Sequence, residues 1–277
     1  MKRTALVTGA SSGIGRAYAV YFAKEDYDLI ITGRRLDKLN SLASELREKY
    51  NTNTEIIKSE FSRDKDVLKV VDAITSSENI YFLVNNAGYG SGMELQRSPL
   101  LDQMRMLNVH VVASVKLVNA VLPQMIRRKE GAIINVSSIG AYMPAPGNAM
   151  YSATKLFLTS FTESLHMELH QHGIRVQCVC PGMTYSDFHN RRTVGHGLNA
   201  SKLMWMEPEI LVEKSIKSLN GKRIVFVPGI INKSLLGVVS LLPRRLYYLI
   251  MERTVNVNLR PGLFEQLKQF FRKAVSY

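Results

Sequence analysis

Cysteine is scarce in this chain of 277 residues, which has only Cys178 and Cys180. Two cysteines cannot form the disulfide framework of a small secreted domain, so a reducing compartment, the cytoplasm, is expected. Both occur in IRVQCVCP, a run typical of a strand that would turn the two thiols toward one buried face. The alternative is that the two cysteines are metal ligands. No further ligands are spaced to join them, so no metal site is predicted.

Long hydrophobic runs are also lacking. No stretch reaches the roughly 18 consecutive apolar residues that a membrane-spanning helix requires. The start, MKRTALVTGA, meets a glycine too soon to be a signal peptide and is better explained as a first strand. With 46% apolar and 21% charged residues, the composition is that of a folded globular chain. The length suits one α/β domain.

Acidic residues are few, with 23 Asp and Glu against 36 Lys and Arg and a net charge of +13. From Lys214 to the end, twelve Lys or Arg face two Glu. The segment 231–277 adds apolar runs, and Pro243 divides it into what we expect to be two short amphipathic helices. This extension could pack on the domain or a sister subunit, rest peripherally on an anionic membrane, or receive an acidic carrier protein. We favour packing first, membrane contact second and a carrier protein third. No nucleic-acid-binding motif is present.

Short β-rich runs alternate with helical ones along most of the chain. Strands are expected at 4–9, 27–33, 54–61, 80–88, 131–138, 173–182 and 223–229, and helices at 15–25, 36–50, 66–77, 100–128, after Tyr151 and at 208–219. This alternation predicts an α/β fold, a doubly wound parallel sheet of seven strands with helices on both faces. We expect one domain over 1–230, followed by the basic amphipathic extension over 231–277.

The first turn of this pattern is rich in glycine. TGASSGIG, residues 8–15, joins the first expected strand to the first helix. Gly9 permits a sharp turn, while Gly13 and Gly15 allow a pyrophosphate and the helix to approach the backbone closely. Free amides at the helix N-terminus would then face the anion. The turn therefore predicts a phosphate site for a dinucleotide.

YSATK, residues 151–155, places a phenol and an ammonium four residues apart near the start of an expected helix. Tyr151 and Lys155 would lie one above the other on a single face. A nearby positive charge favours the phenolate, so Lys155 is expected to lower the pKa of Tyr151 from its usual value near 10. Tyr151 would then be a usable acid or base at a carbonyl oxygen. Taken alone, the pair could equally be two neighbours on a surface.

These motifs follow the order and spacing of the short-chain dehydrogenase/reductase family, which the sequence resembles from about residue 4 to 230. The shared features are TGxxxGxG, NNAG at 85–88, Asn108 in the long helix, Ser138 thirteen residues before Tyr151, Lys155, and Pro181–Gly182 after the sixth strand. The resemblance implies a Rossmann-fold oxidoreductase acting on CH-OH groups. Such an enzyme interconverts a ketone or aldehyde and an alcohol with a nicotinamide cofactor.

The resemblance also implies residue roles. Ser138 would hold and polarise the substrate oxygen, and Tyr151 would exchange its proton. Lys155 would also bind the nicotinamide ribose, and Asn108 would hold a water linked to Lys155. Cofactor contacts are expected from Gly9, Ser11, Ser12, Gly13, Ile14, Gly15, Arg34, Arg35, Glu60, Phe61, Asn86, Ala87, Gly88, Tyr151, Lys155, Pro181, Gly182 and Thr184.

The end of the second expected strand, ITGRR, bears on the choice of cofactor. NAD-preferring sites place an acid there, whereas this chain has Gly33 followed by Arg34 and Arg35. Guanidinium groups suit a 2′-phosphate, so NADP(H) is predicted over NAD(H). Two solvated arginines are the alternative. Two motifs depart from the family: SEF has Glu60 in place of an aspartate, and PGMTYS replaces P-G-x-V-x-T.

Apolar residues occur in segments where the family builds its substrate pocket. They are Met93, Tyr142, Met143, Phe188, Met204, Trp205 and Met206, and His189 and His196 lie nearby. They suggest a small lipophilic carbonyl or alcohol, such as a steroid, retinoid, 3-oxoacyl or xenobiotic compound, although they could instead form core or subunit contacts. The resemblance further implies a homodimer or homotetramer formed through the helix at 100–128 and the next one.

Two other functions share part of this pattern. A dinucleotide-binding sensor or scaffold would need the glycine turn but not an intact Ser138, Tyr151 and Lys155. A sugar-nucleotide epimerase or dehydratase shares the Tyr-Lys pair but usually has a shorter glycine spacing and a larger substrate domain. An active oxidoreductase is therefore the favoured hypothesis.

Overall fold

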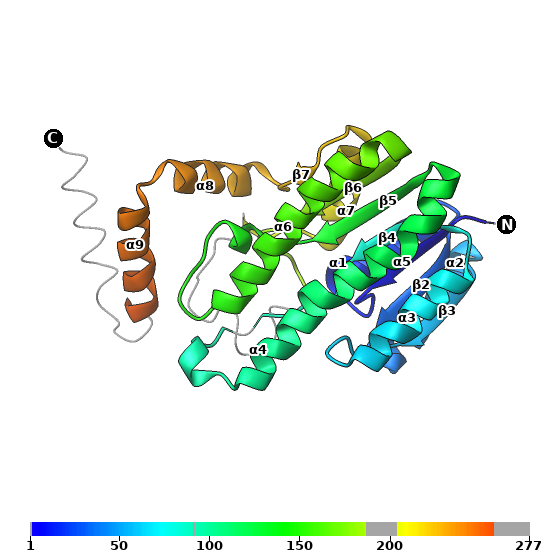
Figure 1. Ribbon diagram of the computed structural model, residues 1–277, viewed down its shortest axis with the longest axis horizontal. Coiled ribbons are helices and arrows are strands. Elements are labelled where there is room, and N and C mark those ends of the chain that lie inside the picture. The colour runs from blue at the N-terminus through cyan, green and yellow to red at the C-terminus, as the bar shows by residue number, and fades with distance from the viewer. Residues whose placement is uncertain (1, 91, 187–203, 258–277) are drawn as a thin grey trace.

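One parallel sheet of seven strands forms the centre of the protein (Figure 1). The computed structural model describes residues 2–90, 92–186 and 204–257. The strands are β1 (Thr4–Thr8), β2 (Asp28–Gly33), β3 (Thr54–Lys58), β4 (Ile80–Asn85), β5 (Gly131–Val136), β6 (Ile174–Val179) and β7 (Val225–Phe226). Their order is β3-β2-β1-β4-β5-β6-β7, which confirms the expected doubly wound fold. The order reverses between β1 and β4, where open α/β sheets bind ligands.

Helices cover both faces of the sheet. They are α1 (Gly13–Lys24), α2 (Leu36–Tyr50), α3 (Asp64–Ser76), α4 (Leu100–Leu107), α5 (Ala113–Arg128), α6 (Ala149–Leu169) and α7 (Pro208–Asn220). Alternate residues of each strand serve opposite faces. In β1, Ala5 and Val7 join the core beneath α1, α2 and α7, while Leu6 joins the core beneath α3, α5 and α6. Strands buried on both faces explain why their sequences are nearly all apolar.

The long helix expected at 100–128 is interrupted. A π-helical turn at Asn108–Val112 separates α4 from α5. Such turns insert an extra residue and often occur at functional sites. By length and composition, residues 100–128 could cross a bilayer, whereas the sequence predicted no membrane-spanning helix. Half of the most apolar window of this segment is, however, buried inside the protein. It is therefore a core helix.

Two further helices, α8 (Ile230–Leu241) and α9 (Arg244–Val257), form an arm beyond the sheet. As expected, the chain breaks at Pro243, and the two helices are bent by 120°. Figure 1 shows α8 leaving the domain past β7 and α9 turning at its far end. The Tyr247 hydroxyl of α9 donates to the carbonyl oxygen of Pro144 at 2.8 Å, which ties the arm to the segment before α6. Residues 258–277 of the expected extension lie outside the described residues.

Candidate active site

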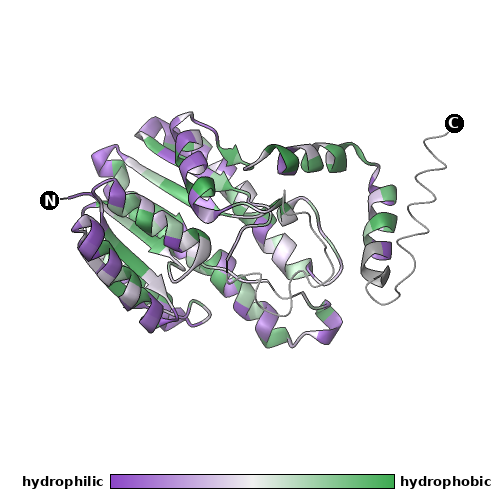
Figure 2. Ribbon diagram, turned by 180° about the vertical axis from the view of Figure 1, so that it is seen from behind, coloured by the Kyte–Doolittle hydropathy of each residue, from purple (hydrophilic) through white to green (hydrophobic). Residues whose placement is uncertain are grey.

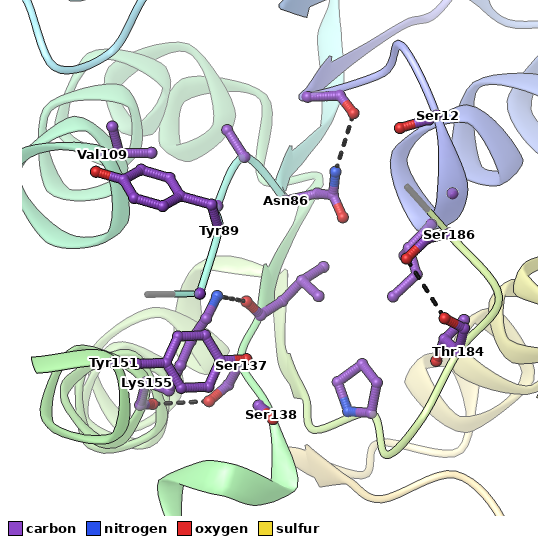
Figure 3. Close-up of a pocket in the computed structure, with 18 of the residues that line it drawn as sticks. Ser12, Asn86, Tyr89, Val109, Ser137, Ser138, Tyr151, Lys155, Thr184 and Ser186 are labelled. Carbon is purple, nitrogen blue, oxygen red and sulfur yellow. Dashed lines mark hydrogen bonds between the residues drawn. The ribbon is translucent and has the colours of Figure 1, made fainter. Parts of the chain in front are cut away.

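A cleft of about 400 Å³ opens at the carboxyl ends of the strands, where the strand order reverses (Figure 3). Of the residues predicted to form the site, those that line this cleft are Gly9, Ser11, Ser12, Gly13, Ile14, Arg34, Arg35, Glu60, Phe61, Asn86, Ala87, Gly88, Ser138, Tyr151, Lys155, Pro181, Gly182 and Thr184. Gly15 and Asn108 are not part of the lining. Segments far apart in sequence thus converge on one cavity.

The glycine turn has the backbone that its sequence predicts. Gly9 and Gly13 have φ values of +68° and +55°, a region that favours glycine. A Cβ on Gly15 would lie 2.4 Å from the Asn86 side-chain amide, so Gly15 allows α1 to approach the loop after β4. The Ser12 side chain does not cap α1, which leaves its first amides available to an anion. The turn therefore fits the pyrophosphate of a dinucleotide.

The segment after β6 lies against the same turn. A Cβ on Gly13 would come within 2.5 Å of the Ser186 Cβ, so only a glycine allows this approach. Ser186, which stands at the threonine position of the family motif, lines the cleft beside Thr184. Its hydroxyl donates to the Thr184 carbonyl at 3.4 Å (Figure 3). The altered motif thus still contributes a hydroxyl to the cavity.

Thr8 and Asn86 join the glycine turn to the loop after β4. The Asn86 side-chain amide donates to the Thr8 carbonyl at 2.9 Å. The Thr8 hydroxyl oxygen accepts the backbone N–H groups of Asn86 and Ala87, at 2.9 and 3.0 Å. These bonds fix two walls of the cleft relative to each other. The Asn86 side chain therefore has a structural task, whatever contact its backbone makes with a cofactor.

The two arginines after β2 lie differently. The Arg35 guanidinium donates to the hydroxyls of Ser11 and Ser12, at 2.9 and 2.8 Å, and so lies over the glycine turn. Arg34 pairs with Glu60 at 3.4 Å. Both partners are partly exposed, so this pair adds little stability. Arg34 also borders an adjoining basic hollow with Lys58, Arg63, Lys65 and Lys69. This end of the cleft is rich in cations.

Ser138, Tyr151 and Lys155 meet at the other end of the cleft (Figure 3). Ser138 begins a short 3-10 turn (Ile139–Ala141), and its Oγ accepts the Gly140 N–H at 3.0 Å. Tyr151 and Lys155 lie in the first two turns of α6. Lys155 Nζ donates to the Val136 carbonyl at 2.8 Å, and the Ser137 hydroxyl donates to the Lys155 carbonyl at 2.7 Å. These bonds hold the start of α6 against the end of β5.

The expected lowering of the Tyr151 pKa is wrong in this structure. Burial raises the pKa of Tyr151, although its hydrogen bond with Ser138 opposes the rise. Lys155 Nζ lies 5.9 Å from the centre of the phenol ring and bonds to the backbone instead. Burial also lowers the pKa of Lys155 to about 8. Burial is thus the largest cause of the pKa shift of each group, and Tyr151 holds its proton at neutral pH.

The π-helical turn contributes residues that the sequence analysis missed. Asn108 starts the turn, but the next residue, Val109, is the one that lines the cleft. His110 is fully buried, and its Nε2 accepts the Tyr89 N–H at 3.0 Å. Its pKa lies well below the usual value because of burial and the charge of Lys155, so the ring is neutral. A lone histidine in the apolar stretch NVHVV was the available signal.

The described residues among those predicted to line the substrate pocket lie outside this cleft. None of the described ones borders the cleft: Trp205 stacks on Tyr185 with centroids 4.9 Å apart, Met206 packs on the core, and Met93 is 41% exposed. Tyr142, Met143 and Met204 are likewise absent from its lining. Tyr89 and Met183 line the cleft instead, each next to a predicted motif. Phe188, His189 and His196 lie outside the described residues.

Comparison with known proteins agrees with this geometry. The family model of short chain dehydrogenases matches residues 3–195. The chain therefore belongs to the short-chain dehydrogenase/reductase family, as the motifs predict, and its fold and cleft are those of an oxidoreductase that uses a nicotinamide dinucleotide. Members of this family commonly work as oligomers on small molecules.

Three individual matches illustrate the range of relatives. The very-long-chain 3-oxoacyl-CoA reductase of Mus musculus is 32% identical over 89% of this chain and 78% of its own length. A short-chain dehydrogenase from Sphingobium yanoikuyae, solved with NADPH, has a TM-score of 0.77 at 28% identity, covering 87% of this chain and 96% of the other. A 7beta-hydroxysteroid dehydrogenase has a TM-score of 0.83 at 27% identity, covering 90% and 96%.

Proposed function

We propose that the protein is an NADP(H)-dependent oxidoreductase that interconverts a lipophilic ketone or aldehyde and its alcohol. The observation that carries this proposal is the single cleft itself. Ser138, Tyr151 and Lys155 occupy one end, and Arg34 and Arg35 occupy the other. A dinucleotide laid along the glycine turn would reach both ends.

The side chains at the catalytic end have complementary tasks. Ser138 Oγ accepts the Gly140 N–H and shares a hydrogen bond with the Tyr151 hydroxyl, so the two hydroxyls together can bond a substrate oxygen. Tyr151 keeps its proton at neutral pH and can give it to that oxygen during reduction. Lys155, with a pKa of about 8, is cationic at pH 7 and favours the phenolate that remains. When bound, the nicotinamide supplies or accepts the hydride.

The preference for NADP(H) rests on the end of β2. A Cβ on Gly33 would meet Leu39 at 3.6 Å and Ser11 at 3.7 Å, which are ordinary contacts. Packing therefore does not require glycine there, and an acid that would bind a ribose hydroxyl could be accommodated. The chain instead offers Arg34 beside Lys58 and Arg63, which suits a 2′-phosphate. The relative solved with NADPH supports the same choice.

A lipophilic substrate is supported by the apolar groups near Tyr151 and by the relatives. Tyr89, Val109 and Met183 line the cleft. The similar mouse enzyme is named for a very-long-chain 3-oxoacyl thioester, and the similar solved structure for a hydroxysteroid. We therefore place long-chain 3-oxoacyl and steroid carbonyls ahead of small polar aldehydes.

A homodimer or homotetramer would use the exposed apolar side chains of α6. Leu156, Phe157 and Met167 are exposed, and the Phe157 ring stacks on Phe161 with centroids 5.7 Å apart. Light scattering should give a mass above 31.2 kDa for the wild type and a lower mass for Phe157→Glu.

Cofactor titration followed by turnover assays tests the proposed function. NADPH should bind tightly and NADH weakly, as followed by nicotinamide fluorescence, and NADPH should then reduce a long-chain 3-oxoacyl thioester or a ketosteroid. Equal binding of both dinucleotides would overturn the preference for NADP(H). Tight binding without turnover of any carbonyl would favour a dinucleotide sensor instead.

A further inference from the structure

Helix α8 is apolar over most of its surface and has little cover from the domain. Its sequence is IINKSLLGVVSL, in which Lys233 is the one charged residue and Asn232 the one buried residue. Ile230 is 76% exposed, Val238 60% and Leu241 85%. Figure 2 shows the hydrophobic colour along most of this helix. An isolated helix of 12 residues is marginal in water, and a helix with so wide an apolar face is normally covered. Something outside the domain should therefore cover it.

The arm is attached to the domain at two points that leave α8 itself free. Near its start, Asn232 donates to the Pro228 carbonyl at 2.8 Å and packs closely on Gly182. Beyond its end, Tyr247 is buried and bonds to Pro144. Between these points, the exposed side chains of α8 have no domain surface to meet. The helix is therefore presented outward rather than loosely attached.

Basic residues surround the start of this helix. Lys214 and Lys217 of α7, Arg223 before β7, and Lys233 of α8 line one shallow hollow together with Ile230. Within the part of the chain that the structure describes, none of these four cations pairs with an acid, whereas cations elsewhere do, such as Lys69 with Asp66. Arg244 and Arg245 follow the other end of α8. An apolar helix with cations at both ends is complementary to lipid tails beneath anionic headgroups.

We propose that α8 lies flat in the surface of an anionic membrane and docks the protein there. A helix of 12 residues is about 18 Å long, which is too short for a hydrocarbon core of about 30 Å. The 120° bend to α9 also excludes a straight span through both helices. The helix therefore embeds its apolar side chains while the surrounding lysines and arginines contact lipid phosphates.

A second copy of the chain fits this surface less well. In a two-fold dimer built on this surface, the unpaired cations around Lys214 and Lys217 of both copies would be gathered in one interface. Like charges in such an interface oppose association. The exposed apolar side chains of α6 offer a subunit contact without that repulsion between like charges.

Vesicle co-sedimentation of the full chain tests the proposal. Two vesicles are used, one of phosphatidylcholine alone and one of equal parts phosphatidylcholine and phosphatidylglycerol. The protein should bind the anionic vesicle more tightly, and added salt should weaken that binding. Val238→Ser/Leu241→Ser should lower the affinity by more than about tenfold, because each buried apolar side chain contributes strongly. Lys217→Gln should lower it by about fivefold, the effect of one charge near the surface.

Matched variants on other surfaces serve as controls. Leu100→Ser removes an apolar side chain that is 72% exposed on α4, and Lys24→Gln removes an exposed cation on α1. Both should bind vesicles as the wild type does. NADPH binding measured without vesicles should be unchanged in every variant, because none of the substituted residues lines the cleft, and this confirms folding.

Three results would overturn the proposal. In the first, the wild type binds neither vesicle. In the second, the α8 variants bind as well as the wild type, which would place the contact elsewhere in the chain. In the third, Val238→Ser/Leu241→Ser lowers the solution mass while no form of the protein binds lipid. That result would assign α8 to contact with a second copy.

Discussion

The Nδ1 of His110 lies 2.9 Å from the hydroxyl oxygen of Thr154. Because Nε2 of the same ring accepts the Tyr89 N–H, Nδ1 carries the proton and donates it to Thr154. Thr154 in turn donates to the Tyr151 carbonyl at 2.9 Å. This chain of bonds links the loop after β4, the π-helical turn and the helix of Tyr151. One neutral ring thereby positions three walls of the cleft.

Replacement of His110 should affect folding and turnover together. His110→Leu leaves the Tyr89 N–H and the Thr154 hydroxyl without their partner, so the free energy of unfolding should fall by about 2 kcal/mol. Urea denaturation measures this loss. Ser114→Ala is the control, because Ser114 bonds only to the His110 carbonyl one turn away. Unchanged stability of His110→Leu would show that water replaces the ring without cost.

Removal of the Tyr151 hydroxyl should separate binding from chemistry. Tyr151→Phe keeps the ring but not the proton, so kcat should fall by at least about 10²-fold while the Kd for NADPH is nearly unchanged. Tyr142→Phe removes a hydroxyl that does not line the cleft and should leave kcat close to that of the wild type. Steady-state kinetics and fluorescence titration provide the two readouts. Persistent turnover in Tyr151→Phe would assign the proton to another group.

Cofactor preference should change through residues 33 and 34. Arg34→Ala should weaken NADPH binding by about tenfold or more, because it removes a charge-assisted bond to the 2′-phosphate, and should leave NADH binding unaffected. Gly33→Asp should weaken NADPH binding further and strengthen NADH binding, since the new carboxylate can bond to ribose hydroxyls. Fluorescence titration of each variant with both dinucleotides gives the ratio of affinities. If the ratio of NADPH to NADH affinity is unchanged in both variants, the end of β2 does not determine the cofactor preference.

The buried ammonium of Lys155 should reduce stability below about pH 8. Its pKa falls from 10.5 to about 8 on burial, so the folded state binds fewer protons than the unfolded state between these values. Stability therefore rises with pH across that window, and the full penalty, about 3 kcal/mol at most, applies below it. Lys155→Met should raise the free energy of unfolding at pH 7 and lose that advantage as the pH approaches 10.5. Urea denaturation of the wild type and the variant across this pH range measures the effect. A gain in the free energy of unfolding that does not depend on pH would contradict the prediction.

Much of the site could be predicted from the sequence because its signals are local. The glycine turn is a run of eight residues whose backbone takes positive φ values at Gly9 and Gly13. The Tyr-Lys spacing follows from the helical repeat. The doubly wound parallel sheet followed from the alternation of strands and helices, without knowledge of any side-chain contact.

The rest depends on contacts between distant segments. His110 acquires its role through Tyr89 and Thr154, which are 21 and 44 residues away, and through a π-helical turn that shifts its direction. The pKa of Tyr151 depends on burial, which the spacing to Lys155 does not reveal. Trp205 was expected in the substrate pocket on family position alone, and its stacking on Tyr185 is a contact that the sequence does not reveal.

The bond between Tyr247 and Pro144 joins residues that are 103 positions apart. Pro144 belongs to the segment between Ser138 and Tyr151, so a ligand that shifts this segment acts on α9 as well. Coupling of this kind is reciprocal. If a ligand in the cleft changes the affinity of the arm for its partner by some factor, binding of that partner changes the affinity of the cleft for the ligand by the same factor. Occupancy of the cleft and attachment of the arm would then share one coupling free energy, which can be measured from either end.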